Sequence, residues 1–164
     1  MSSPEISVIM PVYNEEKYVK EAVESILNQT FTNFEFIIIN DGSNDDTDQL
    51  INQLCINDQR IRYLKHDNIG LTRSLNKGIH LAKGKYIARI DADDISYKNR
   101  LELQYNFLEN SDCVMVGAQR VIKDYINNKI WTDSLPLTTS EIRRTGIKKN
   151  PFFHSLVMIK KDIF

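Results

Sequence analysis

The chain has 164 residues, of which 41% are hydrophobic and 26% are charged, a composition that is ordinary for a soluble globular domain and excludes disordered and fibrous classes. Twenty-one basic and 22 acidic residues give a formal net charge of −1, so the basic field that draws proteins onto nucleic acid is missing and no nucleic-acid partner is expected. No apolar run reaches the roughly 20 residues of a membrane helix, and the N-terminus lacks the pattern of a signal peptide. The chain is therefore expected to be cytoplasmic.

Strands and helices are predicted to alternate from the N-terminus. Residues 6–12 form a short apolar run typical of a strand buried on both faces. Residues 15–29 carry apolar side chains at three- and four-residue spacing, which predicts an amphipathic helix. Residues 34–39 predict a second strand, closed by the turn formers of residues 40–43. A helix is predicted to begin near Asp45, because acidic residues crowd its first turn.

The same alternation continues as far as residue 121, with strands at 61–64, 86–90 and 114–121 and helices at 70–82 and around 101–108. This order predicts an α/β fold with a Rossmann-like, mostly parallel sheet and helices on both faces. Residues 1–122 are assigned to this α/β domain. Beyond Asp124 the pattern weakens, and a hairpin at Asn127-Asn128, a short helix over 138–145 and a strand over 156–159 are predicted.

Acidic and aromatic residues follow several of the predicted strands. Tyr13-Asn14-Glu15 follows the first, Asp41 the second, and Asp91, Asp93 and Asp94 the fourth. Because ligands bind at the carboxyl ends of strands in open α/β sheets, these side chains are expected in one cleft.

Carboxylates that are brought close together repel each other, and a bound cation removes that repulsion. Oxygen ligands without a nearby set of His or Cys residues favour Mg²⁺ or Mn²⁺, held by one or two carboxylates and the phosphates of a substrate. Asp94 is the predicted metal ligand, and Asp93 beside it is predicted to reach the metal or a ribose. A solvated acidic loop is the alternative.

Four ordered motifs carry a resemblance that covers nearly the whole chain. The chain resembles the family 2 glycosyltransferases of the GT-A fold, which are nucleotide-diphospho-sugar transferases. The matching motifs are Val8-Ile9-Met10-Pro11-Val12-Tyr13-Asn14-Glu15, Ile39-Asn40-Asp41-Gly42-Ser43 followed by Asp46-Thr47, Asn68-Ile69-Gly70 with Arg73, and Asp91-Ala92-Asp93-Asp94. Four motifs at compatible spacings are specific, whereas an isolated Asp-x-Asp would be weak.

The resemblance implies a site for a nucleotide-sugar donor. Asp41 would accept a hydrogen bond from the base, which suits uracil because its N3 carries a proton, so a UDP-sugar is the expected donor. The ring of Tyr13 would stack on that base. The implied nucleotide-binding residues are Pro11, Val12, Tyr13, Glu15, Asp41, Arg73, Asp91, Ala92 and Asp93, with Arg73 meeting the diphosphate, and the implied metal ligands are Asp93 and Asp94. The alternatives are a half-buried aromatic for Tyr13, a turn or helix cap for Asp41, and a helix-surface side chain for Arg73.

The implied reaction is metal-dependent, inverting transfer of a sugar from its nucleoside diphosphate to an acceptor hydroxyl, in polysaccharide or glycan synthesis. Inversion needs a general base, which the family supplies in a later Glu-Asp-type motif. Here Asp162 is the only acidic residue after Glu141, so the base is expected beyond Phe164, and the chain is expected to be a C-terminally truncated fragment that retains donor binding and lacks much of the acceptor side. Residues 123–164 would begin the acceptor-binding region, with His154 as a secondary candidate for the base.

Alternatives for the whole chain remain. A nucleotidyltransferase acting on activated sugars would place a Gly-rich basic loop after the first strand, and a receiver-like or other non-catalytic binding module would place an acidic pair there; neither matches Tyr13-Asn14-Glu15. The acceptor that the resemblance implies is a saccharide or a lipid-linked acceptor. A solvated face, or peripheral contact with anionic lipid at the cytoplasmic side of a membrane, explains the basic residues Arg143, Arg144, Lys148, Lys149, Lys160 and Lys161. His66 and His80 are predicted at the surface, and Arg89, which interrupts the fourth strand, has no predicted role.

Overall fold

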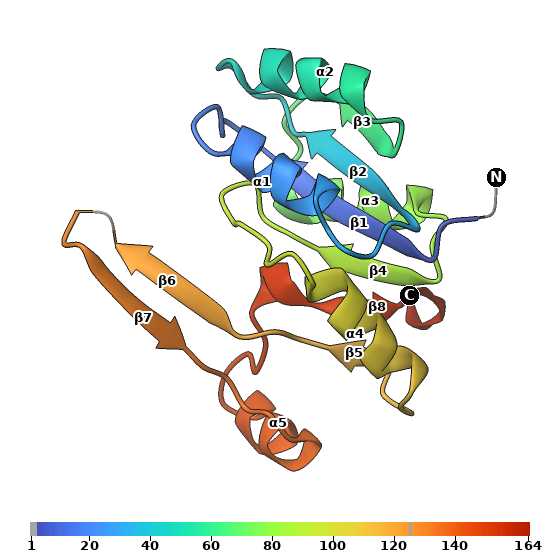
Figure 1. The fold of residues 1–164 in the computed structure, drawn as a ribbon, viewed down its shortest axis with the longest axis vertical. Coiled ribbons are helices and arrows are strands. Elements are labelled where there is room, and N and C mark those ends of the chain that lie inside the picture. Colours follow the sequence, from blue (N-terminus) through green and yellow to red (C-terminus); the bar gives the residue numbers. More distant parts are fainter. Residues whose placement is uncertain (1–2, 125) are drawn as a thin grey trace.

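The computed structural model describes residues 3–124 and 126–164 and contains a six-stranded sheet in the order β3-β2-β1-β4-β8-β5 (Figure 1). Its parallel part consists of β1 (Ile6–Val12), β2 (Phe34–Asn40), β3 (Ile61–Lys65) and β4 (Tyr86–Arg89). β8 (Met158–Lys160) runs antiparallel to β4 and to β5 (Met115–Val116). The predicted α/β fold with a mostly parallel sheet is confirmed.

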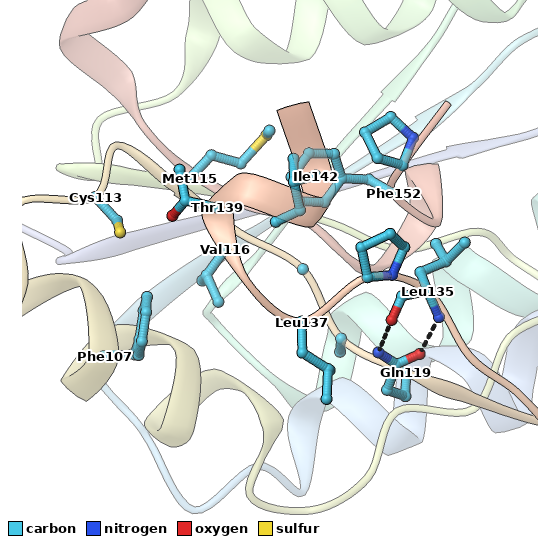
Figure 2. A pocket seen from close by; sticks show the side chains of 14 residues that line it. Phe107, Cys113, Met115, Val116, Gln119, Leu135, Leu137, Thr139, Ile142 and Phe152 are labelled. Atoms are coloured by element: carbon cyan, nitrogen blue, oxygen red, sulfur yellow. Dashed lines mark hydrogen bonds between the residues drawn. The ribbon is translucent and has the colours of Figure 1, made fainter. Parts of the chain in front are cut away.

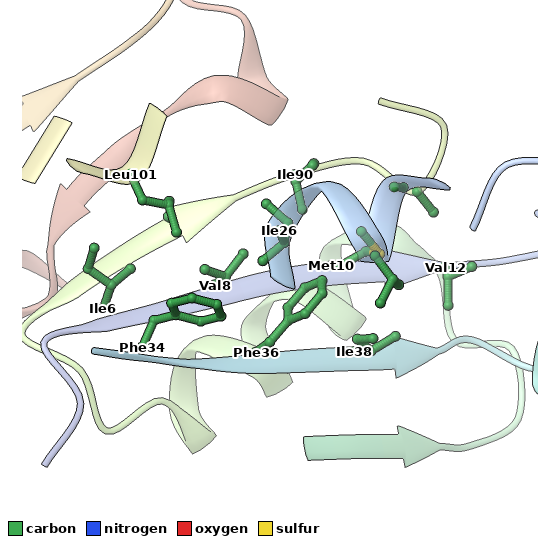
Figure 3. Packing of buried hydrophobic residues seen from close by; sticks show 14 of the residues in the cluster. Ile6, Val8, Met10, Val12, Ile26, Phe34, Phe36, Ile38, Ile90 and Leu101 are labelled. Atoms are coloured by element: carbon green, nitrogen blue, oxygen red, sulfur yellow. The ribbon is translucent and has the colours of Figure 1, made fainter. Parts of the chain in front are cut away.

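Helices cover both faces of this sheet. On one face, α1 (Val19–Leu27), α2 (Thr47–Asn57) and α4 (Arg100–Glu109) pack on the larger cluster of buried side chains, part of which Figure 3 shows. On the other face, α3 (Leu71–Leu81) packs on a smaller cluster that includes Ile9, Ile37 and Ile39. Alternate residues of β1 and β2 therefore enter different clusters, which is why apolar residues occupy both faces of these strands, with Ser7, Glu35 and Asn40 as the polar exceptions.

The close approach of α3 to the sheet depends on Gly78. A Cβ atom at this position would lie 2.7 Å from Cγ2 of Ile9 and 2.8 Å from Cδ1 of Ile39, so any larger residue would push the helix outward. The burial that this packing achieves is complete for Ile37 and Ile39, which have 0% exposure. Each fully buried side chain of this type contributes roughly 1.5–3 kcal/mol.

The later part of the chain differs more from the prediction. The strand predicted over 114–121 is wrong as one element: it divides into β5 and β6 (Arg120–Asp124), with Gly117 between them. A Cβ atom on Gly117 would lie 2.9 Å from Cδ1 of Phe152, so this ring packs directly against the glycine between the two strands. β6 and β7 (Lys129–Asp133) form the predicted hairpin, which is separate from the main sheet (Figure 1).

The remaining elements lie close to their predicted positions. α5 (Thr139–Gly146) begins with a capping box between Thr138 and Glu141, which satisfies the first free N–H groups of the helix. The strand predicted over 156–159 begins later, because η1 (His154–Leu156) forms one 3₁₀ turn before β8, and η2 (Lys161–Ile163) follows it. None of the helices in the described ranges is sufficiently long and apolar to span a membrane.

Candidate functional site

A cleft of about 520 Å³ opens at the carboxyl ends of β1, β2 and β4. It is lined by Pro11, Val12, Tyr13, Glu15, Asp41, Asn68, Gly70, Leu71, Arg89, Asp91, Ala92, Asp93 and His154. The lining therefore includes most of the predicted site residues. Of these, Arg73 and Asp94 lie outside the lining.

The loops after β1 and β2 are tied together by hydrogen bonds that explain several motif residues. The N–H groups of residues 14, 15 and 16 donate to the side chains of Ser43, Thr47 and Asp45 at 3.0, 2.8 and 3.1 Å. Asn14 adopts a left-handed backbone with φ 55° to make this turn. The acidic side chain of Asp45 therefore supports the loop, and these contacts hold Tyr13 and Glu15 at the cleft.

Asp41 joins the end of β2 to the loop that precedes α3. Its side chain is 6% exposed, and its two carboxylate oxygens accept hydrogen bonds from the N–H groups of Ile69 at 2.8 Å and Gly70 at 2.9 Å. These donors immediately precede α3, so Asp41 anchors the loop that leads into this helix. Each oxygen has a second lone pair, so the same carboxylate retains acceptor capacity for a ligand.

His66 lies against Asp41 and was not predicted to be there. Its side chain is only 12% exposed, and its Nδ1 atom lies 3.4 Å from Oδ1 of Asp41 and 2.8 Å from the carbonyl oxygen of Asp67. The prediction of a surface histidine is therefore wrong, whereas His80 is exposed as predicted. The signal was available, because His66 directly follows β3 at the same edge of the sheet as the acidic residues.

Arg89 explains the position of Asp91. Arg89 is buried at the end of β4, and its Nη2 atom donates to Oδ1 of Asp91 at 2.7 Å, while its Nη1 atom contacts Nδ1 of His154. Burial lowers the pKa of Arg89, and Asp91 and Asp94 oppose that change. Burial raises the pKa of Asp91, an effect that Arg89 opposes and that Asp94 and Asp93 reinforce. Asp91, whose side chain is 39% exposed at the cleft, is thus already paired with a buried arginine.

Asp93, which lines the cleft, and Asp94, which lies outside its lining, differ in their freedom to bind a cation. Asp94 accepts a hydrogen bond on Oδ2 from Oγ of Ser155 at 2.6 Å. Asp93 is exposed, and its carboxylate has no hydrogen-bond or ion-pair partner among the described residues. In the described part of the chain, no three His, Cys, Asp or Glu side chains are grouped to hold one metal ion. Any cation here would therefore need ligands from a substrate.

The acidic residues of the cleft affect the pKa of Glu15. Its pKa is raised above the ordinary value, mainly by burial and further by repulsion from Asp93, Asp45 and Asp91. Tyr13, by contrast, is 45% exposed, so one side of its ring is free to contact a ligand. Arg73 lies on the exposed side of α3, as the helix-surface alternative describes.

A second cavity, of about 190 Å³, lies between α4, β5 and α5 and is different in character (Figure 2). Its walls are mostly apolar, with side chains such as Phe107, Met115, Ile142 and Phe152. The polar contact within it is the pair of hydrogen bonds between Gln119 and the backbone of Leu135, at 3.0 and 2.7 Å. Acidic groups are absent from its lining, so the charged chemistry of the described residues gathers in the first cleft.

The architecture places the chain among glycosyltransferases of the GT-A fold. The mannosyltransferase PcManGT from Pyrobaculum calidifontis, crystallised in complex with GDP-Man and Mn²⁺, matches with a TM-score of 0.73 at 16% identity, over 99% of this chain and 46% of its own. Residues 1–349 of S. aureus TarS in complex with UDP-GlcNAc match with a TM-score of 0.63 at 28% identity, over 68% of this chain and 33% of that one.

The particular family follows from the sequence comparisons. Residues 7–164 match the family described as Glycosyl transferase family 2. The uncharacterized glycosyltransferase MJ1057 of Methanocaldococcus jannaschii is 38% identical over 168 residues, which cover 99% of this chain and 58% of that protein. The chain belongs to glycosyltransferase family 2, as the four motifs predict, and it spans little more than half the length of this relative.

Proposed function

We propose that this chain binds a UDP-sugar together with Mn²⁺ or Mg²⁺, as the donor site of an inverting glycosyltransferase for polysaccharide or glycan synthesis. The observation that carries the proposal is the shared cleft of Asp41, Asp91 and Asp93, which come from the ends of two different strands. Polar groups that converge at the carboxyl edge of an α/β sheet form its usual ligand site.

The nucleotide base is assigned to the end of the cleft formed by Pro11, Val12 and Tyr13. The exposed ring of Tyr13 supplies a stacking surface. Asp41, already fixed by Ile69 and Gly70, presents its remaining lone pairs to a base that carries an N–H group, which uracil does at N3. The binding of UDP-GlcNAc by the 28%-identical TarS supports the choice of a uridine nucleotide.

The cation is assigned to Asp93 and Asp94. Asp93 is exposed at the cleft without a protein partner among the described residues, and Asp94 would exchange its hydrogen bond with Ser155 for a ligand bond. Two carboxylates and the oxygens of a diphosphate match the way Mg²⁺ is ordinarily held, and Mn²⁺ accepts the same ligands. When bound, this cation would neutralise the charge that develops on the leaving diphosphate.

The acceptor is assigned to a saccharide hydroxyl, free or lipid-linked. Inversion by a single displacement requires a group that accepts the hydroxyl proton on the acceptor side. His154 lies at the cleft beside Arg89 and Asp91. Its protonation state decides whether it can accept that proton.

Thermal unfolding with a panel of nucleotides tests the proposal. UDP at about 100 times its dissociation constant stabilises the fold by about 2.7 kcal/mol, which corresponds to a rise in Tm of roughly 5–10 °C for a chain of this size. That rise should occur in Mn²⁺ and disappear in a chelator. Asp93→Asn and Asp94→Asn should reduce it, while Asp112→Asn, at an exposed position outside the cleft, should not.

The same panel separates the alternatives. A larger shift with UTP than with UDP would favour a nucleotidyltransferase. No shift with any nucleotide would favour an interaction module without a nucleotide site. A shift of equal size with GDP would contradict the assignment of uracil.

A further inference from the structure

The contact between Arg89 and His154 defines where the imidazole carries its proton. A guanidinium has only N–H donors, so the nitrogen that it contacts must offer a lone pair. Nη1 of Arg89 contacts Nδ1 of His154. Nδ1 is therefore unprotonated, and a neutral imidazole then carries its single proton on Nε2.

Both the backbone and the side chain of Arg89 are held by other contacts near His154. The backbone N–H of Arg89 donates to the carbonyl oxygen of Val157 at 3.0 Å, and the backbone carbonyl oxygen of Arg89 accepts from Nη1 of Arg100 at 3.0 Å. The side chain of Arg89 is 8% exposed. Its other terminal nitrogen is engaged by Asp91 at 2.7 Å. Burial and the Arg89 charge lower the pKa of His154, and Asp91 opposes them, which favours the neutral ring.

The cleft needs hydrogen-bond donors if it is to hold an anionic ligand among its carboxylates. At the end formed by β4 and its loop, the lining residues are Arg89, Asp91, Ala92, Asp93 and His154. One N–H of each terminal nitrogen of Arg89 is used by Asp91 or His154, and the rest of this side chain, including the unpartnered Nε, is buried. His154 is exposed, so its Nε2 is the side-chain donor at this end that a ligand can reach.

We propose that Arg89 is a positioning residue that fixes His154 as an Nε2–H donor to a diphosphate oxygen of the bound nucleotide, an inference that rests on the proposed function. His154 then has no lone pair on its cleft side. It acts neither as the general base nor as a metal ligand through Nε2, and it contributes to holding the donor.

The tautomer can be observed directly by ¹⁵N NMR of histidine-labelled protein without ligand. The three histidines of the chain provide internal comparisons. Nδ1 of His66 faces a carbonyl oxygen, so His66 should show the Nδ1–H tautomer, whereas the exposed His80 should show a mixture of the two tautomers. His154 should show the Nε2–H tautomer. The His154→Gln variant assigns its signals. An Nδ1–H form, a mixture of tautomers or a doubly protonated ring for His154 at pH 7 would overturn the proposal.

The role of Arg89 is tested by Arg89→Met, which removes the donor and keeps much of the side-chain volume. The signals of His154 should then shift to a mixture of tautomers, and an unchanged Nε2–H form would overturn the role of Arg89. If this variant does not fold, the spectrum of the unaltered protein still decides the tautomer.

The ligand contact is tested by comparing His154→Ala with His154→Gln, because glutamine retains an N–H donor but cannot act as a base. His154→Ala should weaken UDP binding about tenfold, the scale of one hydrogen bond to a charged group, while His154→Gln should stay within about threefold of the unaltered protein. Uridine, which lacks the diphosphate, should bind both variants equally. If His154→Ala bound UDP as tightly as the unaltered protein, the proposed contact between His154 and the diphosphate would be overturned. Failure of UDP to bind the unaltered protein would instead reject the proposed function, without affecting the NMR result.

Discussion

Carboxylates lie at both ends of the strands of the sheet. At one end they are surrounded by hydrogen-bond donors, and at the other end they are surrounded by further acidic groups. At the amino end of β2, Glu35 accepts hydrogen bonds from Ser7 Oγ at 2.7 Å, the Lys83 N–H at 2.6 Å and Arg62 Nη1 at 2.7 Å. At the carboxyl end of β1, Glu15 lies near other acidic groups and its pKa is raised. The first carboxylate is satisfied by the protein itself.

This difference separates acidic residues that stabilise the fold from those available to a ligand. Burial alone would raise the pKa of Glu35, but hydrogen bonds from Arg62, Ser7 and Lys83 outweigh it, and the pKa is lowered. Glu15 and Asp93 have no comparable donors among the described residues. Close carboxylates without donors are tolerated at low cost only when a cation can join them.

The largest effect is expected at the amino end. Glu35→Ala should lower the free energy of unfolding by about 2–4 kcal/mol, because it leaves buried donors without partners. Urea denaturation followed by circular dichroism measures the loss. Asp93→Ala, the matched change at the carboxyl end, should alter stability by less than about 0.5 kcal/mol. Similar losses in the two variants would contradict the distinction between the two ends.

At the carboxyl end, the stability of the fold should depend more on backbone geometry than on charge pairing. Gly42 has φ 79°, and a Cβ atom there would lie 2.7 Å from the backbone N of Asn68. Gly42→Ala should therefore cost about 1–3 kcal/mol and weaken UDP binding, since it moves the loop that Asp41 anchors. Gly70 has φ 90° but open space around its Cβ position, so Gly70→Ala should cost less, as measured by the same denaturation. The reverse order would contradict this account of the loop.

The two ends should respond oppositely to acid, beginning with Glu35. A carboxylate whose pKa is lowered by folding contributes stability above its unfolded pKa, about 4.3, and loses it as the pH falls through the folded value. Glu35→Gln should therefore be less stable than the unaltered protein at pH 7, and the difference should shrink toward pH 3. A difference that is independent of pH would show that the charge of Glu35 contributes nothing.

The smallest effect is expected for Glu15. Because folding raises its pKa, its contribution favours the fold below the unfolded pKa and is lost as the pH rises through the folded value. Without a cation at pH 7, Glu15→Gln should raise stability by a few tenths of a kcal/mol, a small gain because the group is only partly buried and solvent screens its charge. Added salt should reduce this gain. A loss of stability in low salt would mean that Glu15 has favourable partners in the fold.

Much of this organisation is predictable from local sequence patterns. The mostly apolar runs of β1, β2 and β4 define strands buried on both faces, and the polar residues that follow them mark the cleft. Contacts between distant residues are not predictable in this way: the pairing of Arg89 with His154, the hydrogen bond from Ser155 to Asp94 and the position of His66 beside Asp41 all depend on the assembled fold. The division of residues 114–121 likewise depends on Phe152 packing against Gly117.

The most direct test is a calorimetric titration of UDP into the unaltered protein, once with Mn²⁺ and once with a chelator. If the cleft binds a diphosphate through a shared cation, saturable binding of one UDP per chain should occur with Mn²⁺ and weaken at least about tenfold without it. Equal affinity under both conditions would contradict the claim that the acidic residues at the carboxyl edge form a cation-dependent nucleotide site.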